Sequence, residues 1–302
     1  MNHSERIATR TAEIGGGLTI RRALPNVRHR TIGAWCFLDH AGPVAVAAGA
    51  GLHVGPHPHI GLQTFTWMIE GAVMHRDSLG NEQLITPGQV NLMTAGAGIS
   101  HSEDSAEPGE APRHERLHAV QLWIALPAAE RHRAPAFRNH PQLPLLQLEG
   151  FTVRVLAGSA VGRTSPAQTF SPLMGVDLQA HGAASLAMPL TSEFEHGVLV
   201  LSGTAVVAGE ALAPGTLLYL GTGREHLDIS CDAAAHLIII GGVPFAEEIL
   251  LWWNFVARSA QEMEEATRDW IAGTRFGTVR GSPSPPLIAP DPSGLRLRSP
   301  GR

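Results

Sequence analysis

The chain has 302 residues, of which 44 % are hydrophobic, and this length is enough for one large core or two cores of ordinary size. The formal net charge is −5, and arginine is the cationic residue used throughout. The sequence therefore offers no broad cationic face for phosphate backbones or anionic lipids. We expect no direct binding of nucleic acid and no association with a membrane.

The two cysteines, Cys36 and Cys231, each lie in an apolar stretch, which is typical of reduced core thiols rather than of a disulfide framework. The N-terminal residues lack the apolar run of a signal peptide, and no later segment has 18 uninterrupted apolar residues. We therefore expect a cytoplasmic protein, and we expect it to be a monomer.

Apolar runs of strand length alternate with Gly, Pro, Asn and Asp along most of the chain, which predicts an all-β fold. The stretch from Asp77 to Leu84 has turn composition and separates two runs with alternating large side chains, so a hairpin is expected there.

Residues 69–98 and 201–223 share one order of features: strand, Gly, strand, Pro-Gly, strand, Gly. This weak repeat predicts two copies of one β unit. The joint falls in the Pro- and Arg-rich stretch 131–146, and we place the boundary near residue 140. The expected domains are therefore residues 1–140 and 141–273.

The second unit is followed by a strand-like apolar run, residues 247–259, and then by a helix. Ser259 and Glu262 have the spacing of a capping box, and Gly273 ends the helical pattern. Spacings of three and four residues place three apolar side chains on one face of this helix: Met263, Ala266 and Trp270.

The remaining residues, 274–302, are rich in Pro, Ser and Arg. Such a segment buries too little apolar surface to fold by itself. We expect a tail that is either disordered or fixed only at Leu287 and Ile288.

The stretch His57-Pro58-His59 presents two imidazoles on one face if it forms a strand, because residues two apart point the same way. Alone, such a pair is more often two ordinary loop histidines. A second pair, His101 and Glu103, follows the predicted hairpin. Strands joined by a hairpin lie about 5 Å apart, so both pairs can meet at one metal ion held by His57, His59, His101 and Glu103.

The second unit has no such histidine pair at the matching position, and we expect no metal there. His196 is expected to face away from the barrel interior, and His226 has no carboxylate two residues later. Roles in turns, packing or at the surface are favoured for the other histidines considered: His40, His75 and His118.

The combination of H-x-H, a 41-residue interval and H-x-E within a Gly- and Pro-punctuated β repeat resembles the cupin superfamily and, within it, the pirin family. The resemblance extends over residues 15–277. It is carried by the following stretches: PHPHIGLQTFTWMIEG (56–71), HRDSLGN (75–81), PGQVNLMTAGAGISHSE (87–103), SEFEHGVLVLSG (192–203) and WWNFVARS (252–259).

This resemblance implies two jelly-roll-like cupin β-barrel domains, one iron in the N-terminal barrel, and a C-terminal element that braces the N-terminal domain. Cupins often use a glutamate four residues after the second histidine, where this chain has Gln63. The pirin pattern takes its carboxylate from Glu103 instead. Gln63 then either hydrogen-bonds a ligand or simply points into the barrel.

The ligand types suit Fe(II), Mn(II), Ni(II), Cu(II) and Zn(II), and the resemblance favours one Fe(II) per chain. It also implies a quercetin 2,3-dioxygenase-like enzyme that uses dioxygen and a flavonol, with Glu103 as the catalytic proton acceptor. Phe65, Met93 and Trp123 are candidates to hold the flat substrate.

Two alternatives remain open from the sequence. The resemblance to eukaryotic pirins also fits a redox-sensitive regulatory binding protein that acts through a protein partner. A third possibility is a cupin that keeps its metal for stability alone.

Overall fold

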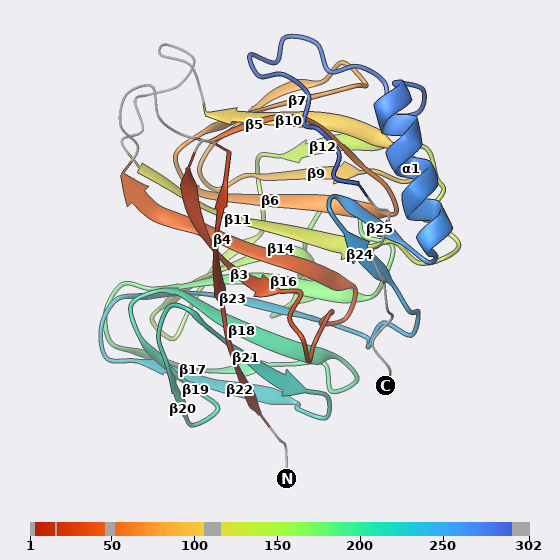
Figure 1. Ribbon diagram of the computed structural model, residues 1–302. Coiled ribbons are helices and arrows are strands. Elements are labelled where there is room, and N and C mark those ends of the chain that lie inside the picture. Colours follow the sequence, from red (N-terminus) through yellow and green to blue (C-terminus); the bar gives the residue numbers. More distant parts are fainter. Residues whose placement is uncertain (1–3, 16, 46–51, 106–115, 292–302) are drawn as a thin grey trace.

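The computed structural model describes residues 4–15, 17–45, 52–105 and 116–291, and the structural statements below concern these residues. They form antiparallel β-sheets and one α-helix, arranged as two barrel units with the helix near the C-terminus (Figure 1). The expected all-β class is confirmed. No helix in this part of the chain is long and apolar enough to cross a membrane.

The first unit is built from two sheets that we call sheets I and II. Sheet I has the order β12 (Ala136–His140), β9 (Val90–Thr94), β6 (Leu62–Glu70), β11 (Arg116–Ala125), β4 (Trp35–Ala45), β3 (Leu18–Leu24) and β2 (Arg10–Ile14). Sheet II has the order β5 (His53–His59), β10 (Ile99–Ser105), β7 (Val73–Asp77) and β8 (Glu82–Ile85). The predicted hairpin at Asp77 is the β7–β8 pair of sheet II.

The second unit repeats this plan with sheets III and IV. Sheet III has the order β1 (Glu5–Ala8), β21 (Thr216–Gly221), β18 (Glu195–Ser202), β23 (Ala235–Gly242), β16 (Leu173–Ala180), β14 (Phe151–Ala160) and β13 (Leu145–Leu148), with β15 (Arg163–Thr164) also paired to β14. Sheet IV has the order β17 (Ala184–Pro189), β22 (His226–Cys231), β19 (Ala205–Val207) and β20 (Glu210–Leu212).

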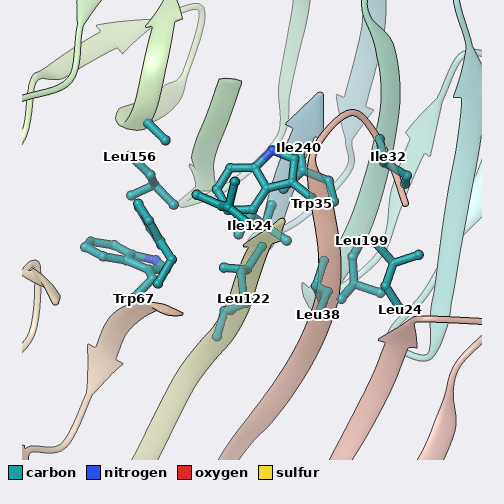
Figure 2. Close-up of a cluster of buried hydrophobic side chains, with 14 of the residues drawn as sticks. Leu24, Ile32, Trp35, Leu38, Trp67, Leu122, Ile124, Leu156, Leu199 and Ile240 are labelled. Carbon is teal, nitrogen blue, oxygen red and sulfur yellow. The ribbon is translucent and has the colours of Figure 1, made fainter. Parts of the chain in front are cut away.

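The two large sheets, I and III, pack face to face, and their side chains form a core shared by both units. Figure 2 shows this core, in which Trp35, Trp67 and Leu122 of sheet I belong to one cluster with Leu199 and Ile240 of sheet III. Because side chains alternate along a strand, one face of sheet I serves this interface. Its other face is left to line the interior of the first barrel.

β12 is an edge strand of sheet I and β13 is an edge strand of sheet III, so the chain passes from the first unit to the second between residues 140 and 145. One strand does not follow the expected assignment of residues 1–140 to the first unit. β1 pairs with β21, with Glu5 opposite Tyr219, so residues 5–8 belong to sheet III. Local patterning carries no information about so distant a partner.

The apolar run 247–259 is folded back on itself, not extended as expected. Its strands β24 (Leu250–Trp252) and β25 (Phe255–Ala257) form a hairpin. Trp253 lies at the tip with φ of 50°, a left-handed conformation that turns the chain. The hairpin crosses to the first unit, where Phe255 pairs with Ile60 and the Val256 N–H donates to the Ile60 carbonyl oxygen.

The helix α1 (Ala260–Ala272) has the predicted bounds. Ser259 accepts a hydrogen bond from the Glu262 N–H, and Gly273 ends the helix with φ of 67°. The capping box is only half formed, because the Glu262 carboxylate accepts from the Arg258 N–H. Met263 and Ala266 are buried, with Trp270 partly buried beside them.

Residues 274–291 are ordered against the first unit, which corrects the expected disordered tail; residues 292–302 lie outside the described part. Phe276 is 2 % exposed, and its carbonyl oxygen accepts from the N–H and hydroxyl of Ser100. The Leu287 N–H donates to the Pro56 carbonyl oxygen on β5. Ile288, expected to be a fixed point, is 92 % exposed. Backbone contacts of this kind leave no compositional signal.

Replacing Phe276 by alanine tests this correction. Phe276 stacks on Phe255, with ring centroids 5.9 Å apart, and removing a buried phenyl ring costs about 3–5 kcal/mol. We expect a loss of that order in the free energy of unfolding by urea. Ile288→Ala is the matched control and should stay within about 0.5 kcal/mol of the unmodified protein. Equal stability of the two variants would contradict the packing described here.

A buried polar network also links the two units. The His40 and His118 Nε2 atoms lie 2.9 Å apart, on β4 and β11. The His118 ring meets the ring of His236 on β23, which hydrogen-bonds Asp177 on β16. The Trp67 indole N–H donates to the same carboxylate at 3.0 Å. The network therefore holds sheets I and III together with groups that can titrate.

Burial lowers the pKa of His40 to about 3 and that of His118 to about 4, from an ordinary 6.5, and the neighbouring charges of Arg21, Arg116 and His236 add to this. Only Asp177 acts in the opposite direction, on His118. As the pH falls below 6.5, these two histidines bind protons in the unfolded chain, whereas in the folded protein they stay neutral until a lower pH. Folding stability is therefore lost progressively from pH 6.5 toward pH 4.

This pH dependence is measurable by urea unfolding of the metal-free protein at pH 7.5 and pH 5.5. Each buried neutral histidine contributes about 1.4 kcal/mol to the loss between these values. His40→Gln should therefore reduce the loss by about 1.4 kcal/mol. His226→Gln, at a side chain 65 % exposed, should leave it unchanged. A His40→Gln variant as acid-sensitive as the unmodified protein would refute the assignment.

Candidate metal centre

The three candidate imidazoles stand on two neighbouring strands of sheet II. His57 and His59 lie on β5, and His101 lies on β10 directly opposite His57. β5 is an edge strand, which accommodates Pro56 and Pro58 because proline has no N–H for a second neighbour. The expected alternation therefore places all three rings on one face.

The three rings converge closely. Their centroids are separated by 5.0 Å (His57–His59), 4.4 Å (His57–His101) and 4.9 Å (His59–His101). One nitrogen of each ring lies within 4.8 Å of the other two, and all three side chains are buried. The Nε2 atoms of His59 and His101 are 3.0 Å apart.

The opposite nitrogen of each ring has a partner of its own. The Nδ1 of His57 is 2.9 Å from the Gly55 carbonyl oxygen, and the Nδ1 of His59 is 2.8 Å from the Asn254 carbonyl oxygen. The Nδ1 of His101 is 3.3 Å from the Nδ1 of His75. A carbonyl oxygen can only accept, so Nδ1 of His57 and of His59 carries the proton. Their Nε2 lone pairs then face the centre.

Burial lowers the pKa of His57 to about 4 and holds the pKa values of His59 and His101 well below 6.5. The neighbouring imidazoles lower these pKa values further. The rings are therefore neutral near pH 7, which is the protonation state in which histidine binds a metal.

These features fit a divalent metal. Three neutral nitrogens converge, the tautomers of His57 and His59 are set by hydrogen bonds on the far side of each ring, and neutral nitrogen donors suit borderline divalent ions. In the described residues this is the one group of three such side chains whose ligand atoms come so close together. It could hold a single ion.

Glu103, the fourth expected ligand, follows a register shift between His101 and Glu103 in the β10–β5 pairing. Its carboxylate is not among the atoms that lie within 4.8 Å of one another. It contacts Thr66 on sheet I, and burial, together with the charge of Asp104, raises the pKa of Glu103 to about 7. The structure thus brings three of the four predicted residues together and leaves Glu103 beside them.

Of the three predicted substrate-holding residues, two lie on the side of the site. Trp123 meets the His59 ring edge-on, with centroids 5.2 Å apart, and Met93 belongs to the same buried cluster. The predicted substrate-holding role of Phe65 is wrong. It packs edge-on to Trp35 in the core between sheets I and III, because odd-numbered residues of β6 point to that face.

The same alternation corrects the expectations for Gln63 and His196. Gln63 donates to the hydroxyl of Thr94 and to the Gln168 carbonyl oxygen of the second unit, so it contacts no ligand. His196 lies on β18 in phase with Val198, whose side chain fills the second barrel. His196 therefore points into that barrel, where both of its ring nitrogens lack a protein partner. His226 is exposed on sheet IV.

Three contributors to the site are not predicted by the sequence: His75, Asp77 and the backbone of Asn254. His75 was expected to have a turn or packing role, yet it contacts a candidate ligand, and Asp77 hydrogen-bonds His75 in turn. The sequence signal was the His-x-Asp spacing immediately before the turn. Asn254 contributes only a backbone carbonyl, which no residue pattern marks.

Comparisons with known proteins agree with this architecture. The family model for pirin matches residues 17–124, and that for the pirin C-terminal cupin domain matches residues 175–277. A Pseudomonas aeruginosa protein named "Putative quercetin 2,3-dioxygenase PA1205" is 52 % identical over 95 % of this chain and 90 % of its own length. A "Pirin-like protein" of Caulobacter vibrioides is 35 % identical over 85 % of this chain and 90 % of its own.

Among solved structures, the crystal structure of a quercetin 2,3-dioxygenase from Acinetobacter baumannii superposes with a TM-score of 0.93 and 48 % identity, over 97 % of each chain. A second one from the same organism gives a TM-score of 0.82 and 27 % identity over 89 % of this chain and 96 % of that one. With both family models matched and relatives of this similarity along nearly its whole length, the chain belongs to the pirin family.

Proposed function

We propose that this protein is an iron-dependent dioxygenase that acts on a flavonol. The observation that carries the proposal is the convergence of three buried, neutral imidazoles. The names of the similar proteins support the substrate class. Two of the solved structures are titled quercetin 2,3-dioxygenase, and the Pseudomonas aeruginosa relative is named "Putative quercetin 2,3-dioxygenase PA1205".

His57, His59 and His101 would hold the metal through Nε2, with Glu103 as the fourth ligand. A bound iron supplies Lewis acidity toward a flavonol hydroxyl and the redox chemistry that dioxygen requires. In the unshifted pairing of β10 with β7, Glu103 lies two residues after His101 and therefore on the same strand face. To become a ligand, Glu103 would have to turn its carboxylate from Thr66 toward the three nitrogens.

The protein's own groups have three tasks in this proposal. A carboxylate oxygen of Glu103 accepts the proton of the substrate hydroxyl. Trp123, itself stacked on Phe37 at 4.1 Å between centroids, provides a flat apolar wall beside His59 for an aromatic ring. The surrounding apolar cluster excludes water, which strengthens polar interactions within the site.

Metal content provides the first test. We expect purified protein to bind about one iron per chain, because the described residues hold one group of three converging ligands. His101→Ala removes one of three nitrogens, so the affinity for iron should fall by at least about 100-fold while the β-sheet circular dichroism spectrum is retained. His226→Ala is the control and should bind iron normally. Two tightly bound irons per chain would contradict the assignment.

Oxygen uptake with quercetin tests the reaction itself. The iron-loaded protein should consume oxygen as the flavonol absorbance disappears, and Glu103→Gln should reduce the rate by at least about 100-fold while keeping most of the iron. Glu193→Gln, an exposed position in the second unit, should behave like the unmodified protein. Full turnover by iron-loaded Glu103→Gln would exclude the proton-accepting role, and no turnover of any flavonol by the iron-loaded unmodified protein would refute the proposed enzyme.

A further inference from the structure

His75 lies between a candidate ligand and a buried carboxylate. Its Nδ1 is 3.3 Å from the Nδ1 of His101, and its Nε2 is 3.2 Å from an oxygen of Asp77. The ring of His75 stacks on Phe137 of β12, with centroids 4.3 Å apart and planes inclined by 10°. Both His75 and Asp77 are buried, so the ring is fixed in position and orientation.

Asp77 is held as an acceptor by the turn that follows it. One oxygen, Oδ1, accepts from the backbone N–H groups of Leu79 and Asn81, at 2.9 and 3.1 Å. The side-chain amide of Asn81 donates to both oxygens, at 3.0 and 2.8 Å. These donors all favour the ionised carboxylate, and an ionised carboxylate offers His75 only an acceptor.

The protonation of the two histidines follows in sequence. Because Asp77 only accepts, a neutral His75 carries its proton on Nε2 and leaves Nδ1 as a lone pair. That lone pair accepts the Nδ1–H of His101. The Nε2 of His101 is then unprotonated and directed to the nitrogen of His59 that lies 3.0 Å away. The turn 78–81 thereby determines which nitrogen of a distant ring is free.

We propose that His75 and Asp77 are positioning residues that fix the tautomer and orientation of His101 for metal binding. This inference rests on the metal centre but not on the dioxygenase reaction. His57 and His59 use backbone carbonyl oxygens for the same purpose, and side-chain substitution cannot remove those. His101 is the ligand whose tautomer depends on side chains.

Asp77→Asn is the sharpest test, because it is nearly isosteric. The backbone N–H groups of Leu79 and Asn81 hold the amide oxygen at the Oδ1 position, so the NH₂ group faces His75. His75 must then accept at Nε2 and donate from Nδ1, and His101 must accept at Nδ1 and carry its proton on Nε2. The nitrogen meant for the metal becomes blocked.

Two variants of His75 separate an acceptor role from simple packing. His75→Asn places an amide oxygen near the position of Nδ1 and keeps an acceptor for His101. His75→Phe keeps the aromatic stacking on Phe137 but has no acceptor. A purely structural role for His75 predicts that His75→Phe is the better tolerated of the two, and the positioning role predicts the reverse.

The first measurement is the tautomer of His101 in the metal-free protein, read from ring ¹⁵N shifts in long-range ¹H–¹⁵N spectra. We expect the Nδ1–H form in the unmodified protein and in His75→Asn, and the Nε2–H form in Asp77→Asn. The second is Fe(II) affinity, which should fall by about 10–100-fold in Asp77→Asn and His75→Phe. His75→Asn should stay within about threefold of the unmodified protein, and His226→Asn is the surface control.

An unchanged His101 tautomer in Asp77→Asn, or equal iron affinity of His75→Phe and His75→Asn, would overturn the proposal. Both outcomes can be separated from failure of the proposed function. If the unmodified protein binds iron but turns over no flavonol, the dioxygenase assignment fails while the tautomer and affinity measurements still decide this one.

Discussion

The candidate metal centre depends on the position of three protons. An imidazole can bind a metal only through a nitrogen that carries no proton, so each ligand ring needs an acceptor on its far side. These acceptors come from three separate places in the chain: Gly55 on the same strand as the ligand it serves, Asn254 from the C-terminal hairpin, and His75 from β7. The site is complete only when all three segments have docked.

This requirement gives the C-terminal region its physical meaning. β25 lies beside Ile60, the residue that follows β5. Residues 274–291 then form hydrogen bonds with Ser100 on β10 and Pro56 on β5. Gly55 has no room for a side chain, because a Cβ there would lie 2.2 Å from the Pro285 carbonyl oxygen. Residues 285–287 therefore cover part of the open edge of β5, which would otherwise expose unpaired backbone groups.

Much of this could be predicted from the sequence, and the parts that could not share a cause. Strand alternation correctly placed His57 and His59 on one face, because alternation is a local rule. The predicted hairpin joins β7 to β8, whereas His101 reaches His57 through the non-local pairing of β10 with β5. Alternation alone gave the wrong result for Phe65 and His196. Phe65 was expected in the first barrel but lies in the core between sheets I and III, and His196 was expected to face away from the second barrel but points into it. Periodicity shows that residues two apart share a face, and it does not show whether that face meets a barrel interior or another unit.

Sheet I illustrates why that distinction matters for function. Thr66 contacts the Glu103 carboxylate, while its neighbours Phe65 and Trp67 lie in the core shared with sheet III. Trp67 also donates to Asp177 of the second unit. A shift of one residue in the register of β6 would exchange these faces. It would break both the contact of Thr66 with Glu103 and the hydrogen bond of Trp67 to Asp177. The described residues of the second unit contribute no ligand to the histidine cluster. This unit still acts on the site, because its contact with Trp67 fixes the register of β6, the strand that carries Thr66.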